Sequence, residues 1–205
     1  MSSYRLNIQF SSRDAKKITA AGQKVTLVKS VRNGGAKVTW VTFEPFNDNT
    51  VEWRTQYGLY SSTQEVMNGA RISQSSTQNP ADSGLYYPFE DNAFGDPTGR
   101  TPKRNDYGIH NLDGRDLTFG LTQAARVRGT DQPPTPLNAV PVFQAETATF
   151  TPIEEVKVFL QSHYNNGVII TRVASRALPV DLTQNPDQTI HYNDKSGRFE
   201  PGPLV

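Results

Sequence analysis

Apolar and polar side chains alternate between Val51 and Tyr60. This alternation limits the possible folds more than any other feature of the sequence. Residues 51–60 read VEWRTQYGLY, with mainly apolar or β-branched side chains at the odd positions and mainly polar ones at the even positions. A period of two is typical of a strand that has one face on a core and the other towards water. We therefore expect Trp53 to be buried and Glu52 and Arg54 to be exposed.

The residues before this strand predict a partner for it. Residues 38–43 are apolar or β-branched on both faces, which is typical of a buried strand. The intervening Asn47-Asp48-Asn49 favours a turn, because Asn and Asp tolerate left-handed backbone and bond to their own chain. We predict a central antiparallel hairpin within residues 37–72.

Other short apolar runs extend the β pattern along the chain. A second hairpin is predicted across residues 153–173, with its turn at Asn165-Asn166-Gly167. Residues 12–21 favour only one or two helical turns. These patterns together predict an all-β fold, an antiparallel β-sandwich or barrel of about 8–10 strands with long polar loops and little helix.

We expect the 205 residues to form one domain. Within it we expect a long loop region at 73–116 and a Pro-rich, extended connection at 129–141. We expect residues 183–205 to form an extended C-terminal tail over the surface.

Composition excludes several classes of protein. The chain has no cysteine, which rules out disulfides and cysteine-ligated metal. Its 21 Lys and Arg nearly balance its 20 Asp and Glu without a basic run, so nucleic acid is not an expected partner. No segment has the roughly 20 apolar residues of a membrane span, and the first ten residues lack a signal-peptide pattern. We expect a cytoplasmic protein, or one released without a cleavable signal peptide.

Motifs for catalysis and for cofactors are missing from the sequence. It has no nucleophile elbow, zinc-protease motif, P-loop or dinucleotide fingerprint. The histidines His110, His163 and His191 are isolated, so we predict no metal site and no cofactor. The candidate carboxylates for a glycosidase acid pair are Glu44 and Glu52, which flank the central turn, and Glu154 and Glu155, which open the last hairpin. Glu52 and Arg54 share the polar face of one strand, so a solvated pair of charges is the favoured interpretation.

Residues 86–116 form the best candidate site, because flat rings and planar polar groups are concentrated there. Sugars pack their C–H faces on aromatic rings and direct their hydroxyls to amides and carboxylates. The predicted stacking residues are Tyr87, Phe94 and Tyr107, and the predicted hydrogen-bonding residues are Asn92, Asp96, His110 and Asp113. The alternative is that the rings only pin a long loop to the body.

Residues 111–116 also resemble half of a calcium loop. The segment lacks the downstream Glu of such a loop and carries Arg115 among the ligand positions. An Asp-Gly turn explains it without a metal.

The leading functional hypothesis is a soluble, non-enzymatic, lectin-like protein that binds a glycan or another small polar ligand. Because such proteins gain avidity from several sites, we also expect a homo-oligomer. One alternative is a pore-forming or membrane-attacking toxin, in which residues 61–83 refold as an amphipathic hairpin. Another is a small β-barrel enzyme that uses His110 or a carboxylate for acid–base chemistry on a small apolar substrate.

Overall fold

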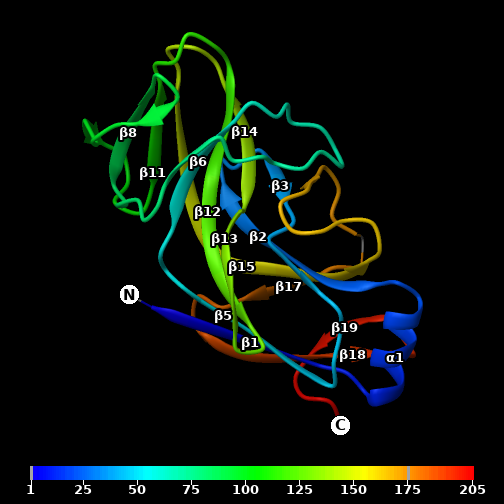
Figure 1. The fold of residues 1–205 in the computed structure, drawn as a ribbon. Coiled ribbons are helices and arrows are strands. Elements are labelled where there is room, and N and C mark those ends of the chain that lie inside the picture. Colours follow the sequence, from blue (N-terminus) through cyan, green and yellow to red (C-terminus); the bar gives the residue numbers. More distant parts are fainter. Residues whose placement is uncertain (1, 175) are drawn as a thin grey trace.

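The computed structural model describes residues 2–174 and 176–205, and within them the chain forms nineteen strands and one α-helix (Figure 1). Two curled mixed sheets carry nearly all of this structure, an arrangement that fits a sandwich or half-barrel. The prediction of an all-β fold is confirmed. The number of strands exceeds the expected number, because several are only two or three residues long.

The first sheet has eleven strands, with the long β12 near its centre. Its main path is β16-β3-β14-β12-β5-β1-β18-β19, with β13 and β6 beside β12 and β7 beside β6. The bounds are β1 (Ser3–Gln9), β3 (Ala36–Val38), β5 (Asp48–Arg54), β6 (Gly58–Ser62), β7 (Ser76–Gln78), β12 (Leu117–Val127), β13 (Thr130–Pro136), β14 (Asn138–Val142), β16 (Ile169–Ile170), β18 (Asp187–Asn193) and β19 (Arg198–Pro201).

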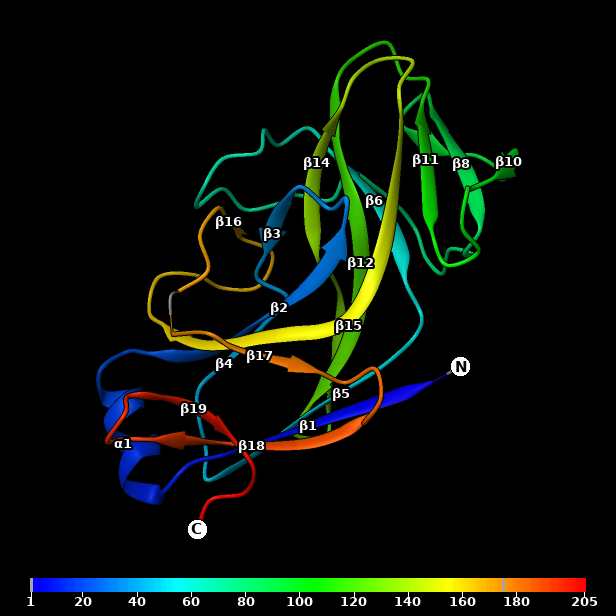
Figure 2. The same ribbon diagram turned by 180° about the vertical axis from the view of Figure 1, so that it is seen from behind.

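The second sheet has eight strands, and the long, curved β15 runs through it (Figure 2). Its main path is β10-β8-β11-β15-β2-β4, with β17 beside β15 and β9 beside β8. The bounds are β2 (Lys24–Arg32), β4 (Val41–Phe43), β8 (Leu85–Glu90), β9 (Ala93–Phe94), β10 (Gly99–Arg100), β11 (Tyr107–Asn111), β15 (Thr147–Gln161) and β17 (Leu178–Asp181).

Pairing is antiparallel except between β1 and β18 and between β8 and β11. The tail predicted for residues 183–205 supplies β18 and β19, which extend the first sheet beyond β1. The loop region predicted for residues 73–116 carries the five short strands β7 to β11. The Pro-rich connection carries two strands, β13 and β14, which both pair with β12.

Both predicted hairpins are wrong, although their strands exist. β4 pairs with β2, whereas β5 pairs with β1 and β12. β15 pairs with β2, β11 and β17, whereas β16 pairs with β3. Turn residues favour a local change of direction but do not fix the partner strand, and in each case the two strands belong to different sheets.

The helix α1 (Ser12–Ala20) lies beside β18 and β19 at one end of the molecule (Figure 1). Its serine cap is Ser11, whose hydroxyl accepts a hydrogen bond from the Asp14 backbone amide at 3.1 Å. Ile18 and Ala15 bury its apolar side. In the described part of the chain, no helix has the length and apolar character needed to cross a bilayer.

The main core lies between the two sheets. Leu6, Val51 and Leu121 from the first sheet pack in one cluster with Leu27 and Val158 from the second. Trp53, as predicted from the alternation, belongs to this core with 3% of its surface exposed. Arg54 on the opposite face of β5 is exposed, and Glu52 is half-buried.

Candidate functional site

Each sheet has one segment in which the strand pairing is irregular, and side chains from these two segments meet in the core. In the first sheet, Glu52 lies opposite Arg126 but Gly58 lies opposite Thr122, so residues 53–57 bulge against the shorter segment 123–125. In the second sheet, the register of β15 against β2 shifts between Pro152 and Val156. Bulges redirect side chains and are frequent beside functional sites.

A buried lysine occupies the space between these bulges. Lys29, on β2, has a side chain with no exposed surface, and its ammonium forms an ion pair with Glu154 of β15 at 2.8 Å. The ammonium also donates to the Tyr57 hydroxyl at 2.9 Å and to Gln123 Oε1 at 2.7 Å. All three N–H donors of the lysine are therefore used inside the protein.

Glu154 is held by further donors from the first sheet. The Tyr57 hydroxyl donates to Oε1 at 2.5 Å and the Trp53 indole donates to Oε2 at 3.0 Å. The rings of Trp40, Trp53 and Tyr57 surround the ammonium with centroids at 5.5, 5.2 and 5.1 Å. Lys29 thus lies in an aromatic cage, which stabilises a cation through the ring quadrupoles.

Burial and pairing shift the pKa values of both charged groups. Burial lowers the pKa of Lys29 to about 8, although the neighbouring carboxylate of Glu154 opposes this shift. Burial alone would raise the pKa of Glu154, but the Lys29 ammonium and the hydrogen bonds from Lys29, Trp53 and Tyr57 outweigh it and lower that pKa. The geometry therefore holds a charged pair that is attractive but costly to bury.

This pair predicts that stability depends on pH in alkaline solution. The pKa of Lys29 falls from 10.5 to about 8 on folding, so above pH 8 the unfolded chain binds more protons than the native protein. The contribution of Lys29 to stability then rises with pH, by roughly 1–2 kcal/mol between pH 8 and 10, and comparison with a variant that lacks Lys29 separates it from tyrosine ionisation, which begins in the same range. Urea titrations of the wild type and the double variant Lys29→Met/Glu154→Leu measure this difference. An equal pH dependence in both proteins would contradict it.

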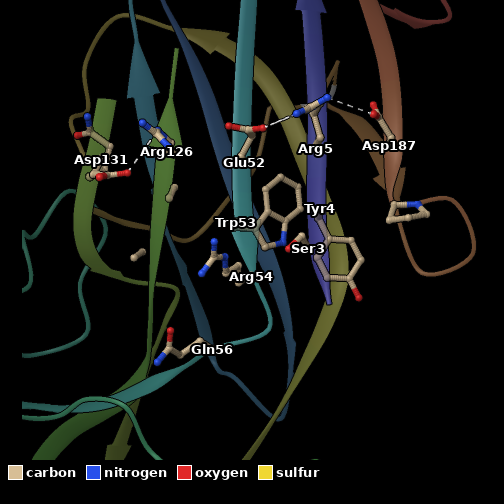
Figure 3. A pocket seen from close by; sticks show the side chains of 14 residues that line it. Ser3, Tyr4, Arg5, Glu52, Trp53, Arg54, Gln56, Arg126, Asp131 and Asp187 are labelled. Atoms are coloured by element: carbon tan, nitrogen blue, oxygen red, sulfur yellow. Dashed lines mark hydrogen bonds and ion pairs between the residues drawn. The ribbon is translucent and has the colours of Figure 1, made fainter. Parts of the chain in front are cut away.

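A row of alternating charges crosses the outer face of the first sheet above this cluster. Five neighbouring strands each place one side chain in it, in the order Asp187, Arg5, Glu52, Arg126 and Asp131. Arg5 lies 2.8 Å from Glu52 and 3.7 Å from Asp187, and Arg126 lies 3.5 Å from Asp131 (Figure 3). Ion pairs this exposed are screened by solvent and add little to stability, so the fold does not require the row.

A groove of about 690 Å³ opens beside the charge row. Ser3 pairs with Arg54 there, and Ala124 lies on β12 two residues before Arg126. The short side chains of Ser3 and Ala124 leave space on either side of Arg54, and this space forms the groove. Its lining comprises Ser3, Tyr4, Arg5, Glu52, Trp53, Arg54, Gln56, Ala124, Ala125, Arg126, Asp131, Gln132, Pro186 and Asp187.

Gln123 connects the buried cluster to the groove. Its side-chain oxygen accepts from Lys29, and its Nε2 donates to the backbone carbonyl of Arg54 at 2.7 Å. The Trp40 indole donates to the backbone carbonyl of Gln123 at 3.0 Å, which holds the Gln123 backbone from the core side of the sheet. The bulged segment that carries Arg54 is thus positioned by hydrogen bonds that end at the buried ion pair.

The aromatic residues predicted to stack on a sugar lie mainly inside the protein. Tyr87 and Tyr107 are 3% and 7% exposed. The Tyr87 hydroxyl accepts from the Asp82 amide at 2.7 Å, and Tyr107 packs edge-on against Tyr57 at 5.6 Å. Phe94 is half-buried and packs edge-on against Phe89 at 4.9 Å. These contacts show the rings packing against the body, as the alternative interpretation of the segment expected.

The predicted hydrogen-bonding residues are only partly brought together. The backbone N–H of Asn92 donates to Asp113 Oδ2 at 3.2 Å, and the Arg115 guanidinium contacts the side chains of Asn92 and Asp113. His110 is half-buried on β11, and Asp96 is exposed in the loop after β9. None of the seven predicted residues lines the groove, and sugar binding through them stays a prediction.

The half calcium loop is occupied by internal hydrogen bonds. Asn111 is buried and donates to the carbonyl oxygens of Val142 and Arg115 at 2.9 and 3.0 Å. Within residues 2–174 and 176–205, no group of three His, Asp or Glu side chains is placed to hold a metal ion.

Comparison with known proteins places the chain in no family: no family model matches it, and no curated protein or solved structure is significantly similar. The groove and the buried cluster beneath it are the candidate site that the structure offers. Sequence patterns identified the strand that carries Glu52 and Arg54 but missed the site, because the row depends on register between distant strands. The available signal was Lys29, a lone charge within the apolar run VTLVKSV of residues 25–31.

Proposed function

We propose that the protein is a non-enzymatic ligand-binding protein that holds a glycan, or a similar polyhydroxylated molecule, in the groove over β1, β5 and β12. The groove itself carries the proposal. It combines a volume of about 690 Å³ with guanidinium, carboxylate and amide groups, short side chains and the half-buried ring of Tyr4. Ligand sites share this combination of apolar walls and a few fixed polar groups.

The balance of charges favours a hydroxyl-rich ligand. The lining holds three arginines, Arg5, Arg54 and Arg126, and three carboxylates, Glu52, Asp131 and Asp187. Such a surface offers donors and acceptors in alternation, which suits hydroxyl groups because each of them both donates and accepts. Half-buried Tyr4, which stacks on Trp53 at 5.7 Å, adds an aromatic surface at one side.

The buried cluster explains how such a site keeps its shape. Preorganised polar groups bind better because less freedom is lost on binding. The hydrogen bond from Gln123 to the Arg54 carbonyl holds the bulge that lies beside the groove. The fully used donors of Lys29 support this positioning role and give the lysine no free hydrogen for a substrate.

Filling the groove is expected to abolish binding. Ala124 is exposed at the groove, so Ala124→Trp adds a large ring to this space without entering the core. We expect glycan-array signals to fall at least about tenfold, as expected when a central contact surface is blocked. The matched control is Ala93→Trp, at another exposed strand alanine outside the groove.

The same pair of variants separates the two locations for a ligand. Ala93 neighbours the predicted site residues Asn92 and Phe94, so loss of binding in Ala93→Trp alone would place the ligand at the segment 86–116. No glycan binding by the wild type would contradict the proposed function. We also expect a dimer or larger assembly, which sedimentation equilibrium would detect.

A further inference from the structure

We propose that Arg54 makes the groove selective for acidic glycans by binding a carboxylate of the sugar. This inference rests on the proposed function, since it names the class of glycan that the groove takes. It starts from a difference between Arg54 and the other charged groups of the lining.

Arg54 is the arginine of the groove that lacks an acidic partner in the described part of the chain. Arg5 is paired with Glu52 and Asp187, and Arg126 is paired with Asp131. These pairs use all three carboxylates of the lining. The Arg54 guanidinium is exposed and forms no ion pair or hydrogen bond within residues 2–174 and 176–205.

The neighbours of Arg54 leave room for a ligand. Ser3, its cross-strand partner on β1, and Ala124 on β12 have short side chains. In Figure 3 the Arg54 side chain lies between β5 and β12, apart from the three ion pairs of the charge row. A guanidinium in this position presents its parallel N–H groups to the groove, and these match the two oxygens of a carboxylate.

The backbone of Arg54 is fixed more firmly than that of an ordinary surface arginine. Its carbonyl accepts from Gln123 Nε2 at 2.7 Å, and Gln123 is 1% exposed and bonded to Lys29. The backbone of Arg54 is therefore fixed within the bulge, whereas its guanidinium is exposed to the groove. The amide of Gln56, which lines the same groove, adds a donor suited to a neighbouring sugar hydroxyl.

Matched sugars test the inference directly. An array carrying galacturonic acid, glucuronic acid and sialic acid oligosaccharides, with their neutral or methyl-esterified counterparts, compares the same shapes with and without the charge. We expect the acidic members to bind about 10- to 100-fold more tightly, because a hydrogen bond to a charged group contributes that much. Sulfated counterparts on the same array distinguish a requirement for carboxylate from a requirement for any anion.

Substitution of Arg54 should remove this preference. In Arg54→Gln, acidic and neutral members should bind equally, whereas Arg54→Lys should keep a smaller preference because it retains the charge without the fork. Arg100→Gln, at an exposed strand arginine outside the groove, should behave as the wild type. Thermal melts should change little, since the Arg54 guanidinium forms no ion pair or hydrogen bond with the residues that the structure describes.

The outcomes separate this inference from the proposed function. Equal binding of acidic and neutral glycans by the wild type, or an acidic preference that survives in Arg54→Gln, would overturn the role of Arg54 and leave glycan binding intact. A preference for sulfated over carboxylated sugars that depends on Arg54 would overturn the carboxylate assignment. Absence of binding to every glycan would overturn the proposed function itself.

Discussion

Replacing Glu154 with leucine is expected to lower the free energy of unfolding by about 3–5 kcal/mol, because removal of one member of a buried pair leaves the other charge uncompensated. Lys29 would remain with no exposed surface and without its carboxylate at 2.8 Å. The Tyr57 hydroxyl and the Trp53 indole would also lose the acceptor that they share. Urea denaturation at pH 7 measures the loss.

The double variant shows whether this loss belongs to the pair. Lys29→Met/Glu154→Leu removes both charges and keeps apolar volume, so it should recover most of the stability lost in the single variant. Glu146→Gln, at an exposed carboxylate just before β15, should change stability by no more than about 0.5 kcal/mol. If Glu154→Leu lowered the free energy of unfolding as little as Glu146→Gln does, the ion pair with Lys29 would not be needed for stability. Lys29 would then have another partner or would lose its proton at no cost.

Recovered stability need not mean recovered binding. In the native protein the Lys29 ammonium donates a hydrogen bond to Gln123 Oε1 at 2.7 Å. The double variant removes this donor from the Gln123 side chain. The same side chain holds the Arg54 carbonyl, so the groove should become less ordered although the fold is stable. Buried polar groups of this kind contribute to a defined geometry more than to stability.

Local sequence pattern was sufficient to predict which side of a strand faces the core. The alternation from Val51 onward correctly assigned Trp53 to the interior and Arg54 to the surface. It did not show that the regular pairing with β12 stops after Glu52, because the bulge arises from a mismatch in length between the two strands. Periodicity reports the environment of each residue, whereas register is a property of two strands.

The residues of the candidate site could not be grouped from the sequence for the same reason. Asp187 and Arg5 are neighbours in the charge row only because β18 returns to pair in parallel with β1. Lys29 and Glu154 meet because β2 and β15 are adjacent in the second sheet. The density of aromatic residues instead favoured residues 86–116 as the site, although Tyr87 and Tyr107 of this segment pack in the core. Composition cannot distinguish an aromatic ring that is buried in the core from one that is exposed and able to bind a ligand.

Truncation of Trp53 is expected to cost about 3–5 kcal/mol, the usual loss when a buried aromatic side chain is reduced to alanine. The ring packs edge-on against Trp40 at 5.3 Å and is stacked on Tyr4 at 5.7 Å. Its indole nitrogen also donates to Glu154, so Trp53→Ala removes packing and a hydrogen bond to a buried charge together. Denaturant titration measures the sum of the two losses.

Two further variants separate those losses. Trp53→Phe keeps an aromatic ring near the Lys29 ammonium but removes the N–H donor, and should cost about 1–3 kcal/mol, as expected for a charged acceptor that loses one partner. Phe46→Ala deletes a ring that is 58% exposed and should cost less than about 1 kcal/mol. A loss below 1 kcal/mol in Trp53→Ala would mean that the indole supports neither the core nor the ion pair. Trp53 also lines the groove, so Trp53→Phe should weaken glycan binding even if the variant folds normally. The packing of β5 would then be linked to ligand binding in the groove.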